Sequence, residues 1–388
     1  MMTTLLHIGR ALTPTTEISD AGILIRDGVI EALGAREGMS LPTGATEISA
    51  TDKIAIPGFL DVHIHGAGGR DVMEGSPEAL AGVSKTVARH GTTSFVATTV
   101  TASPEDTLRS VEGIAHYISQ QHETADARAE VLGIHFEGPF LSPVRRGVHP
   151  LEWLRLPSAE LLNKFLEAAA GKAQILTIAP ELLGAMPCID AARNAGMVVG
   201  IGHTDATYEQ ARAAIAHGAH HAVHVYNAMR PFTHRDSGVI GAVLTSPEVT
   251  AELIADGVHV EETAMKVLLQ AKGPERVILI SDGISATGMP DGNYMLGKLE
   301  VTVSGGICRN SEGKLAGSTL TLDRALRNIV ALGIPLLDTV RMLTLNPAVL
   351  LGIEFKKGVL RTGADADIVL VDEELHLANT WVRGVAVE

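Results

Sequence analysis

Eight short apolar runs alternate with helical patterns over residues 57–290, and this alternation constrains the fold more than any other feature. Most of the runs are continuously hydrophobic, which is typical of parallel strands that are covered on both faces. We therefore predict an α/β fold, a (β/α)8 TIM-like barrel. A doubly wound sheet is the alternative, but it needs fewer strands and a glycine-rich phosphate turn after the first one. The predicted strands are Phe59–His63, Thr93–Ala97, Leu132–Phe136, Ile175–Ile178, Val198–Ile201, His221–Val225, Ala251–Ile254 and Val277–Ile280.

The two ends of the chain follow a different pattern. Short strand-like pieces, broken by Gly, Asp and Pro, occupy the first 56 residues and return after residue 366. We predict one small β-sandwich built from both ends, with domain boundaries at 1–56, 57–356 and 357–388. A β-hairpin is predicted over Gly297–Cys308, with its turn at residues 304–306.

Composition excludes several classes of protein. The chain has 31 Lys and Arg against 45 Asp and Glu, a net charge of −14, so nucleic acid and anionic membranes are poor candidates as partners. It has only 2 cysteines, without metal-type spacing, which argues against a disulfide framework. We find no signal peptide pattern and no uncharged apolar run long enough to span a bilayer. We therefore expect a cytoplasmic protein.

Histidines and carboxylates follow the predicted strands at one end of the barrel, where the active site of this fold lies. His63 and His65 are two residues apart on a strand, so their side chains point to the same face. Each residue alone has an ordinary explanation as a capping or hydrogen-bonding group. Together they indicate a metal centre with six candidate residues: His63, His65, Glu137, His203, His224 and Asp282.

The donor types decide which chemistry this rim can perform. Nitrogen and oxygen ligands without thiolates suit zinc, with iron or manganese as alternatives. Glu137, His203 and His224 can supply three ligands and leave a position for water, while His63 and His65 can complete a second site bridged by Glu137. Asp282 is placed to act as the general base. Such a centre suits amide hydrolysis.

These motifs resemble the amidohydrolase superfamily and, within it, the family of N-acetylglucosamine-6-phosphate deacetylases. The resemblance spans nearly the whole chain, in order. It is carried by PGFLDVHIHGAGG (57–69), HFEGPF (135–140), APE (179–181), GHT (202–204), HVYNAM (224–229), ADGVH (255–259), SD (281–282) and AGSTL (316–320).

The resemblance implies further roles. It implies that His203, His224 and Glu137 bind the metal, that Asp282 is the catalytic acid–base and that His149 lies near the acetyl group. Sugar-phosphate contacts are implied for Asn227 and Ala228, and a phosphate clamp for Arg235 and His259. The clamp of this family can include a residue of the second subunit, which implies a homodimer with the phosphate site near the interface. The His63–His65 pair allows a second metal, and the implied reaction converts N-acetyl-D-glucosamine 6-phosphate to D-glucosamine 6-phosphate and acetate.

Three alternatives stay open. The galactosamine epimer is an alternative substrate, since nothing in the sequence fixes the configuration at C4 of the sugar. A cyclic-amide amidohydrolase is another, although such members use a carboxylated lysine at the end of the fourth strand, where this chain has Ala179 and Pro180. The third is a non-catalytic scaffold that has lost its metal.

Overall fold

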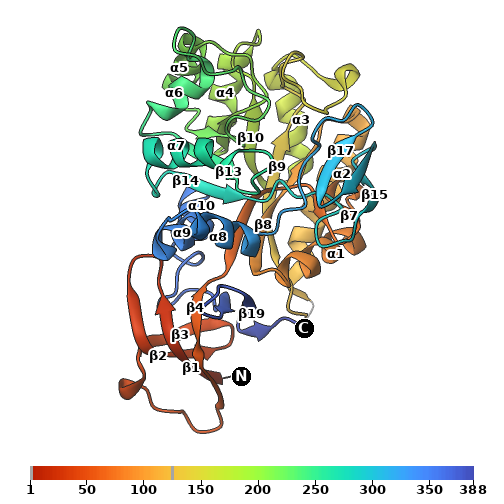
Figure 1. Cartoon of the computed structure of the whole chain (residues 1–388). Helices are drawn as coiled ribbons and strands as arrows, with labels where there is room; N and C mark the ends of the chain where they lie inside the picture. Colours follow the sequence, from red (N-terminus) through yellow and green to blue (C-terminus); the bar gives the residue numbers. More distant parts are fainter. Residues whose placement is uncertain (1–2, 124–125) are drawn as a thin grey trace.

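The computed structural model describes residues 3–123 and 126–388. A barrel of alternating strands and helices forms the larger part, and a separate sheet lies at its base, where both chain ends meet (Figure 1). Among the described residues, none of the helices combines the length and the hydrophobicity needed to cross a bilayer.

The eight predicted strands form one parallel sheet, each next to its neighbour in the chain. The first and last strands are joined by the parallel bridge between Ile64 and Gly283 and by the Asp282 N–H, which donates to the His63 carbonyl at 2.9 Å. The sheet therefore closes, and the predicted barrel is confirmed. The strands are β5 (Phe59–Ile64), β8 (Thr92–Thr99), β9 (Glu130–Glu137), β10 (Ala173–Ile178), β11 (Val198–Ile201), β12 (His221–Ala222), β13 (Thr250–Ile254) and β14 (Val277–Ile280).

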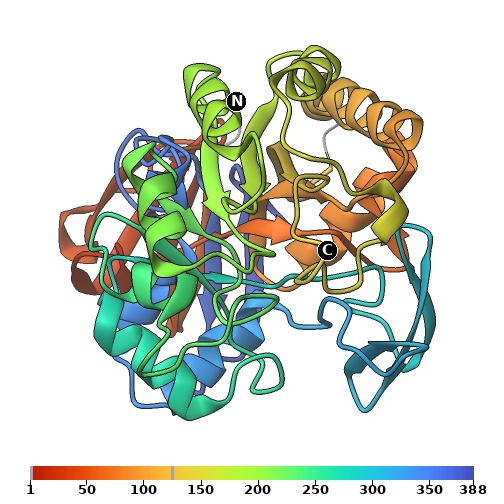
Figure 2. The ribbon, with the colours of Figure 1, turned by 90° about the horizontal axis from the view of Figure 1, so that it is seen from above.

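Helices surround this sheet and bury its outer face (Figure 2). The first begins at Pro77 because the Ser76 hydroxyl accepts from the Ala79 N–H at 3.2 Å, and a proline suits the first helical position. The helices are α1 (Pro77–Ala88), α2 (Pro104–Gln120), α3 (Ala159–Ala169), α4 (Ala185–Asn194), α5 (Tyr208–Ala216), α6 (Gly238–Leu244), α7 (Glu262–Lys272), α8 (Leu322–Ala331), α9 (Leu336–Leu343) and α10 (Leu345–Leu350).

The chain ends together form a second sheet, of seven strands, in the order β20-β19-β18-β4-β1-β2-β3. Its own apolar core includes Leu6, Ile23 and Trp381, so residues far apart in sequence are packed together as predicted. The domain boundaries themselves stay a prediction. The strands are β1 (Thr3–Leu12), β2 (Glu17–Arg26), β3 (Val29–Ala35), β4 (Thr46–Pro57), β18 (Ile368–Val371), β19 (Leu377–Val382) and β20 (Val385–Ala386).

A small antiparallel sheet follows the last barrel strand. It contains β15 (Gly292–Leu296), β16 (Leu299–Ser304) and β17 (Ile307–Asn310), so the predicted hairpin has a third strand. Its inner face packs on Val100 and Met73, close to the carboxyl ends of the barrel strands. A short ribbon of β6 (Gly66–Ala67) and β7 (Arg70–Asp71) lies between β5 and α1.

One barrel strand is shorter than predicted. The sequence predicted a strand over His221–Val225, but β12 ends at Ala222. The backbone turns into the left-handed region at His224, whose φ is 28°, so regular pairing cannot continue there. Val223 and Val225 still donate backbone hydrogen bonds to the two neighbouring strands. The early end of the strand places the His224 side chain inside the barrel mouth.

Candidate active site

Three of the predicted site residues have an unusual backbone conformation. His203, His224 and Asp282 follow β11, β12 and β14, and their φ values are 47°, 28° and 50°. Residues other than glycine rarely adopt this left-handed region, and such strain concentrates at functional sites. The turn of the backbone at each strand end directs these side chains toward one another over the mouth of the barrel.

Glu137, His203 and His224 form the first group of potential ligands. Oε1 of Glu137 lies 3.1 Å from Nε2 of His203 and 2.9 Å from Nε2 of His224. The two Nε2 atoms are 3.1 Å apart. All three side chains are buried, Glu137 with 2% exposure, so this group is shielded from bulk water.

The His63–His65 pair forms the second group with Asp282, beside the same Glu137. Nε2 of His65 lies 3.2 Å from Oδ1 of Asp282 and 3.3 Å from Oε2 of Glu137. Nε2 of His63 lies 3.4 Å from Oε1 of Glu137. Glu137 thus stands between the two groups, one oxygen toward each histidine of the pair.

Hydrogen bonds at the far side of each ring show which nitrogen is free to bind a metal. The Nδ1 atoms of His65 and His203 lie 2.9 and 3.0 Å from the carbonyl oxygens of Thr98 and Arg145, and a carbonyl can only accept. Nδ1 of His63 lies 2.9 Å from the carboxylate of Glu252. Each of these three Nδ1 atoms therefore carries a proton, which leaves Nε2 as the atom of each ring that faces the centre and would bind a metal, as in metal-binding histidines.

The charge balance also fits a divalent cation. Nε2 of His63 is buried and has no hydrogen-bond partner among the described residues. Burial lowers the pKa of His65, but Asp282 and Glu137 outweigh it and raise that pKa to about 9. Burial lowers the pKa of His203 to about 4, so this ring is neutral and able to bind a metal. The buried carboxylates of Glu137 and Asp282 thus favour positive charge at this position, and a divalent cation would supply it.

His149 lies beside the centre, and its ring has the opposite tautomer. Its Nδ1 accepts from the backbone N–H of Thr101 at 3.2 Å, so the neutral ring carries its proton on Nε2. That Nε2 lies 3.5 Å from Oε2 of Glu137. The Nε2–H of His149 therefore faces the carboxylate of Glu137.

Residues 54–387 match the family model described as the amidohydrolase family. The chain belongs to the amidohydrolase family. It is 40% identical to N-acetylglucosamine-6-phosphate deacetylase of Lysinibacillus sphaericus, over 88% of this chain and 87% of that protein. It is 37% identical to N-acetylgalactosamine-6-phosphate deacetylase of Escherichia coli O157:H7, over 99% of both chains.

A solved structure covers the whole of this amidohydrolase. A mutant of N-acetyl-D-glucosamine-6-phosphate deacetylase from Mycobacterium smegmatis, in complex with N-acetyl-D-glucosamine-6-phosphate, superimposes with a TM-score of 0.92. The identity is 37%, and 100% of each chain is covered. The fold and the family therefore agree with the interpretation of the sequence.

A cavity of about 250 Å³ opens above the cluster of this amidohydrolase. Asn227, Ala228 and His259 line it, as does Lys314, which the sequence analysis did not single out. Burial lowers the pKa of His259, but its hydrogen bond with Asp256 at 2.7 Å outweighs this and raises that pKa. His259 thus favours the charged form, which suits an anionic ligand.

Arg235 is not brought to this cavity by its own chain. The side chain is exposed in the loop that precedes α6, and it is absent from the described residues that line the cavity. The predicted phosphate clamp is therefore incomplete within one subunit. Arg235 stays a predicted ligand only if a second subunit supplies it.

Glu252 is a site residue that the sequence analysis missed. It lies on β13 with no exposed surface, and it accepts from His63 Nδ1, from the His224 N–H at 3.0 Å and from His221 Nε2 at 2.8 Å. Nearby charges of His63 and His221 overcome burial and hold the pKa of Glu252 well below its usual value. A carboxylate inside an otherwise apolar strand was the available signal.

We expect Glu252→Gln to weaken metal binding about 10–100-fold, because partners behind a ligand fix its ring orientation and basicity. Competition with a chelator during metal titration measures this change. Glu248→Gln is the matched control, since Glu248 is exposed and pairs with Arg212 at 3.2 Å. Equal metal affinity in the two variants would contradict the positioning role of Glu252.

Proposed function

We propose that this protein hydrolyses the acetamide of N-acetyl-D-glucosamine 6-phosphate to D-glucosamine 6-phosphate and acetate. The observation that carries the proposal is Glu137, shared by two sets of histidines, with Asp282 facing the same point. Full-length relatives with this activity in their names support the substrate. The fourth barrel strand, β10, contains no lysine and is followed by Ala179 and Pro180, which disfavours the cyclic-amide alternative.

Zinc is the metal that we propose for Glu137, His203 and His224, with iron or manganese as alternatives and a second ion at His63 and His65. When bound, such an ion makes a water molecule more acidic and polarises a carbonyl group. The Nε2 lone pairs and the carboxylate of Glu137 suit this class of cation. Metal analysis of the purified protein distinguishes one ion per subunit from two.

The residues of the chain supply the proton transfers. Burial raises the pKa of Asp282, but the hydrogen bond from His65 and the charges of His63 and His65 outweigh it and keep that pKa low. Asp282 is therefore ionised and can take a proton from the attacking water, then deliver it to the leaving amine nitrogen. The Nε2–H of His149 can donate to the carbonyl oxygen of the amide, where negative charge develops.

Acetate release tests the proposal. The metal-loaded protein is assayed with N-acetyl-D-glucosamine 6-phosphate, its galactosamine epimer and a dihydropyrimidine. We expect acetate from the glucosamine substrate with the highest kcat/KM. Preference for the epimer would establish the alternative substrate, and ring opening of the dihydropyrimidine without acetate release would refute the proposal. No hydrolysis of any of them by the metal-loaded protein would revive the non-catalytic scaffold.

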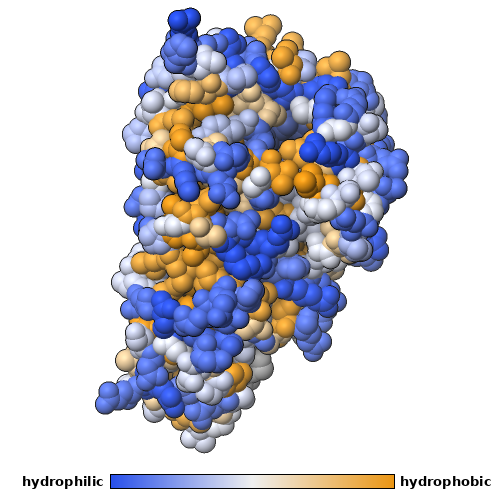
Figure 3. Space-filling view, viewed as in Figure 1, coloured by the Kyte–Doolittle hydropathy of each residue, from blue (hydrophilic) through white to orange (hydrophobic). Residues whose placement is uncertain are grey.

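We further propose a homodimer in which a second subunit completes the phosphate site. Figure 3 shows hydrophobic residues gathered in a band over the α6–α10 side of the barrel. Exposed apolar side chains on this side include Val267 on α7, Val349 on α10 and Phe232, three residues before Arg235. Patches of this kind mark interaction surfaces, and symmetric dimers are the commonest oligomers.

Arg235→Ala should raise KM for the phosphorylated sugar about 10–100-fold and leave KM for the unphosphorylated sugar nearly unchanged, because charge-assisted bonds from Arg to phosphate are lost. Steady-state kinetics on the two substrates measures this change in KM.

Mixed dimers then show which subunit supplies Arg235 to each phosphate site. Refolding Arg235→Ala subunits with Asp282→Asn subunits should restore the wild-type KM if the partner donates Arg235. Persistence of the raised KM in the mixture would place the arginine in its own site.

A cytoplasmic location is also proposed. Cys188 and Cys308 are both free and buried, as is usual in a reducing compartment. The proposed substrate is a phosphorylated sugar, whose charge prevents passive passage through a bilayer. Fractionation of cells that express the protein tests this directly.

A further inference from the structure

A second cavity of about 220 Å³ lies directly behind the site, and four residues line both cavities: Val100, Val148, His149 and Leu296. His149 belongs to the proposed catalytic machinery, which leaves three aliphatic side chains as the remainder of the dividing wall. We propose that Val100, Val148 and Leu296 set the length of the acyl group that the enzyme can remove. This inference rests on the proposed function and specifies one part of it.

The distribution of polar groups around the first cavity orients the substrate. Asn227, His259 and Lys314 supply donors for sugar hydroxyls and phosphate, whereas Val100, Val148 and Leu296 supply only aliphatic surface. An amide whose carbonyl lies at the Glu137–Asp282 cluster extends in two directions, toward the sugar and toward the acyl carbon chain. The hydroxyls and the phosphate require polar partners, so the acyl methyl group faces the aliphatic wall.

The wall is held in place from the inserted sheet. Leu296 is the last residue of β15 and is 6% exposed. The next two residues are anchored: the Gly297 N–H donates to Asp71 at 2.7 Å, and Nζ of Lys298 lies 2.5 Å from Asp106 on α2. A fixed side chain at this position limits the space beyond the methyl group.

The cavity behind the wall has the chemistry of a hydrocarbon site. Its lining includes Met73, Ala102, Pro150, Trp153 and Leu299. Among its charged residues, Glu74, Arg109 and Lys298 are exposed. The buried carboxylate of Asp71 accepts from the backbone N–H groups of Met73 and Gly297, and Asp106 pairs with Arg109 and Lys298, so these acidic groups already have partners. A linear acyl chain of three or four carbons would therefore enter this space only if the wall were shortened.

Substrates of increasing acyl length test the wall. The wild type, Val148→Ala and Leu296→Ala are compared on N-acetyl, N-propionyl and N-butyryl glucosamine 6-phosphate. We expect kcat/KM of the wild type to fall with each added carbon, and the butyryl-to-acetyl ratio to rise about tenfold or more in each variant, the scale of methylene discrimination in an apolar pocket. Val148 is a partly exposed loop residue, so we expect Val148→Ala to fold. It therefore tests the proposal even if Leu296→Ala does not fold.

A variant that refills the second cavity provides the control. Ala102 lines the second cavity but not the site. In the double variant Val148→Ala/Ala102→Leu, we expect the butyryl-to-acetyl ratio of kcat/KM to return to the wild-type value while acetate release continues. An unchanged butyryl-to-acetyl ratio of kcat/KM in both Val148→Ala and Leu296→Ala would overturn the proposal that these side chains limit acyl length. Equal kcat/KM of the wild type for the acetyl and butyryl substrates would also overturn it. Absence of acetate release from the wild type would instead overturn the proposed function, so the two failures are distinguishable.

Discussion

Replacement of Asp282 by Asn should lower kcat about 10²–10⁴-fold, the usual contribution of a general acid–base. The amide keeps the size and polarity of the side chain, but it cannot take a proton from water or return it to the leaving amine. Oδ1 of Asp282 lies 3.2 Å from Nε2 of His65 and 3.6 Å from Nε2 of His63, so the carboxylate faces the cluster at which we propose that the reaction occurs. Steady-state kinetics and metal content are measured on the same preparation.

Asp256→Asn is the matched control for this prediction, because it makes the same change at the end of the neighbouring strand β13. Asp256 contacts His259 rather than the cluster, and it sustains the charge of that ring. We expect a higher KM for the phosphorylated sugar and a much smaller change in kcat. Near-wild-type kcat in Asp282→Asn with metal bound would refute the assigned role of Asp282.

The barrel was predictable because parallel strands covered on both faces read as continuous apolar runs. Val198–Ile201 and Val277–Ile280 were predicted with the bounds that the structure has. The strand at His221 was predicted too long, because hydrophobicity continues through Val223 and Val225 while the backbone leaves the strand at His224. Side-chain patterns report burial, and burial does not distinguish a strand from an irregular segment packed over the barrel.

The juxtaposition of the candidate ligands was also predictable, since barrel topology brings every strand end to one rim. His63, His65, Glu137, His203, His224 and Asp282 do converge there, and their roles as ligands or base stay proposals. The residues behind them were not predictable, because Glu252 contacts His63 across 189 positions of sequence. Lys314 was missed for a similar reason: it reaches the cavity only because the inserted sheet folds over the rim.

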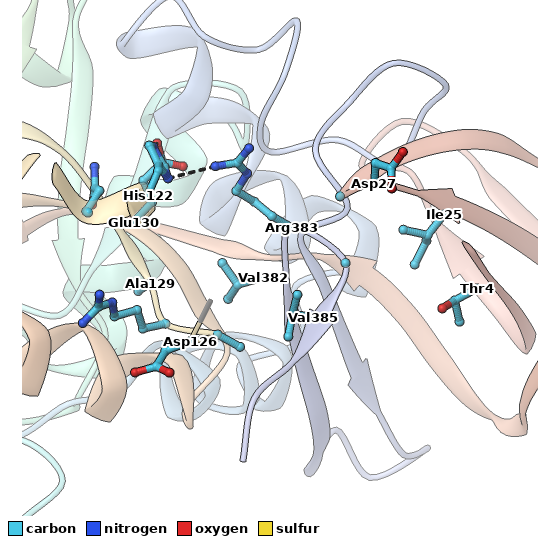
Figure 4. Close-up of a pocket in the computed structure, with 15 residues that line it drawn as sticks. Thr4, Ile25, Asp27, His122, Asp126, Ala129, Glu130, Val382, Arg383 and Val385 are labelled. Atoms are coloured by element: carbon cyan, nitrogen blue, oxygen red, sulfur yellow. Dashed lines mark hydrogen bonds and ion pairs between the residues drawn. The ribbon is translucent and has the colours of Figure 1, made fainter. Parts of the chain in front are cut away.

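The side chain of Lys357 connects the barrel to the terminal sheet through ion pairs. Its Nζ is buried and lies 2.8 Å from Glu130, 3.0 Å from Asp365 and 2.8 Å from Asp367. Glu130 begins β9 of the barrel, while Asp367 also accepts from the Arg383 N–H in the terminal sheet at 2.8 Å. Figure 4 shows the adjoining pocket, where His122 and Glu130 of the barrel side face Arg383 of the terminal sheet.

Burial lowers the pKa of Lys357, but its three carboxylate partners outweigh this and raise that pKa above the ordinary value of 10.5. A raised pKa in the folded state means that the charged lysine stabilises the fold at every pH below 10.5. Lys357→Met should therefore lower the free energy of unfolding by about 3–5 kcal/mol, the cost of leaving buried charges without their partner. Lys356→Met, at the exposed neighbouring position, should change it by less than about 0.5 kcal/mol.

The pH dependence separates this electrostatic cause from a loss of packing. In Lys357→Met the three carboxylates repel one another in the folded state, so their pKa values rise above those of the unfolded chain and the folded state binds more protons. Its stability should consequently increase as the pH falls from about 8 to about 5, and the deficit relative to the wild type should shrink. Urea unfolding at both pH values measures the difference. A deficit of equal size at the two pH values would show that Lys357 contributes through the packing of its aliphatic stem, and not by joining the barrel to the terminal sheet through charge.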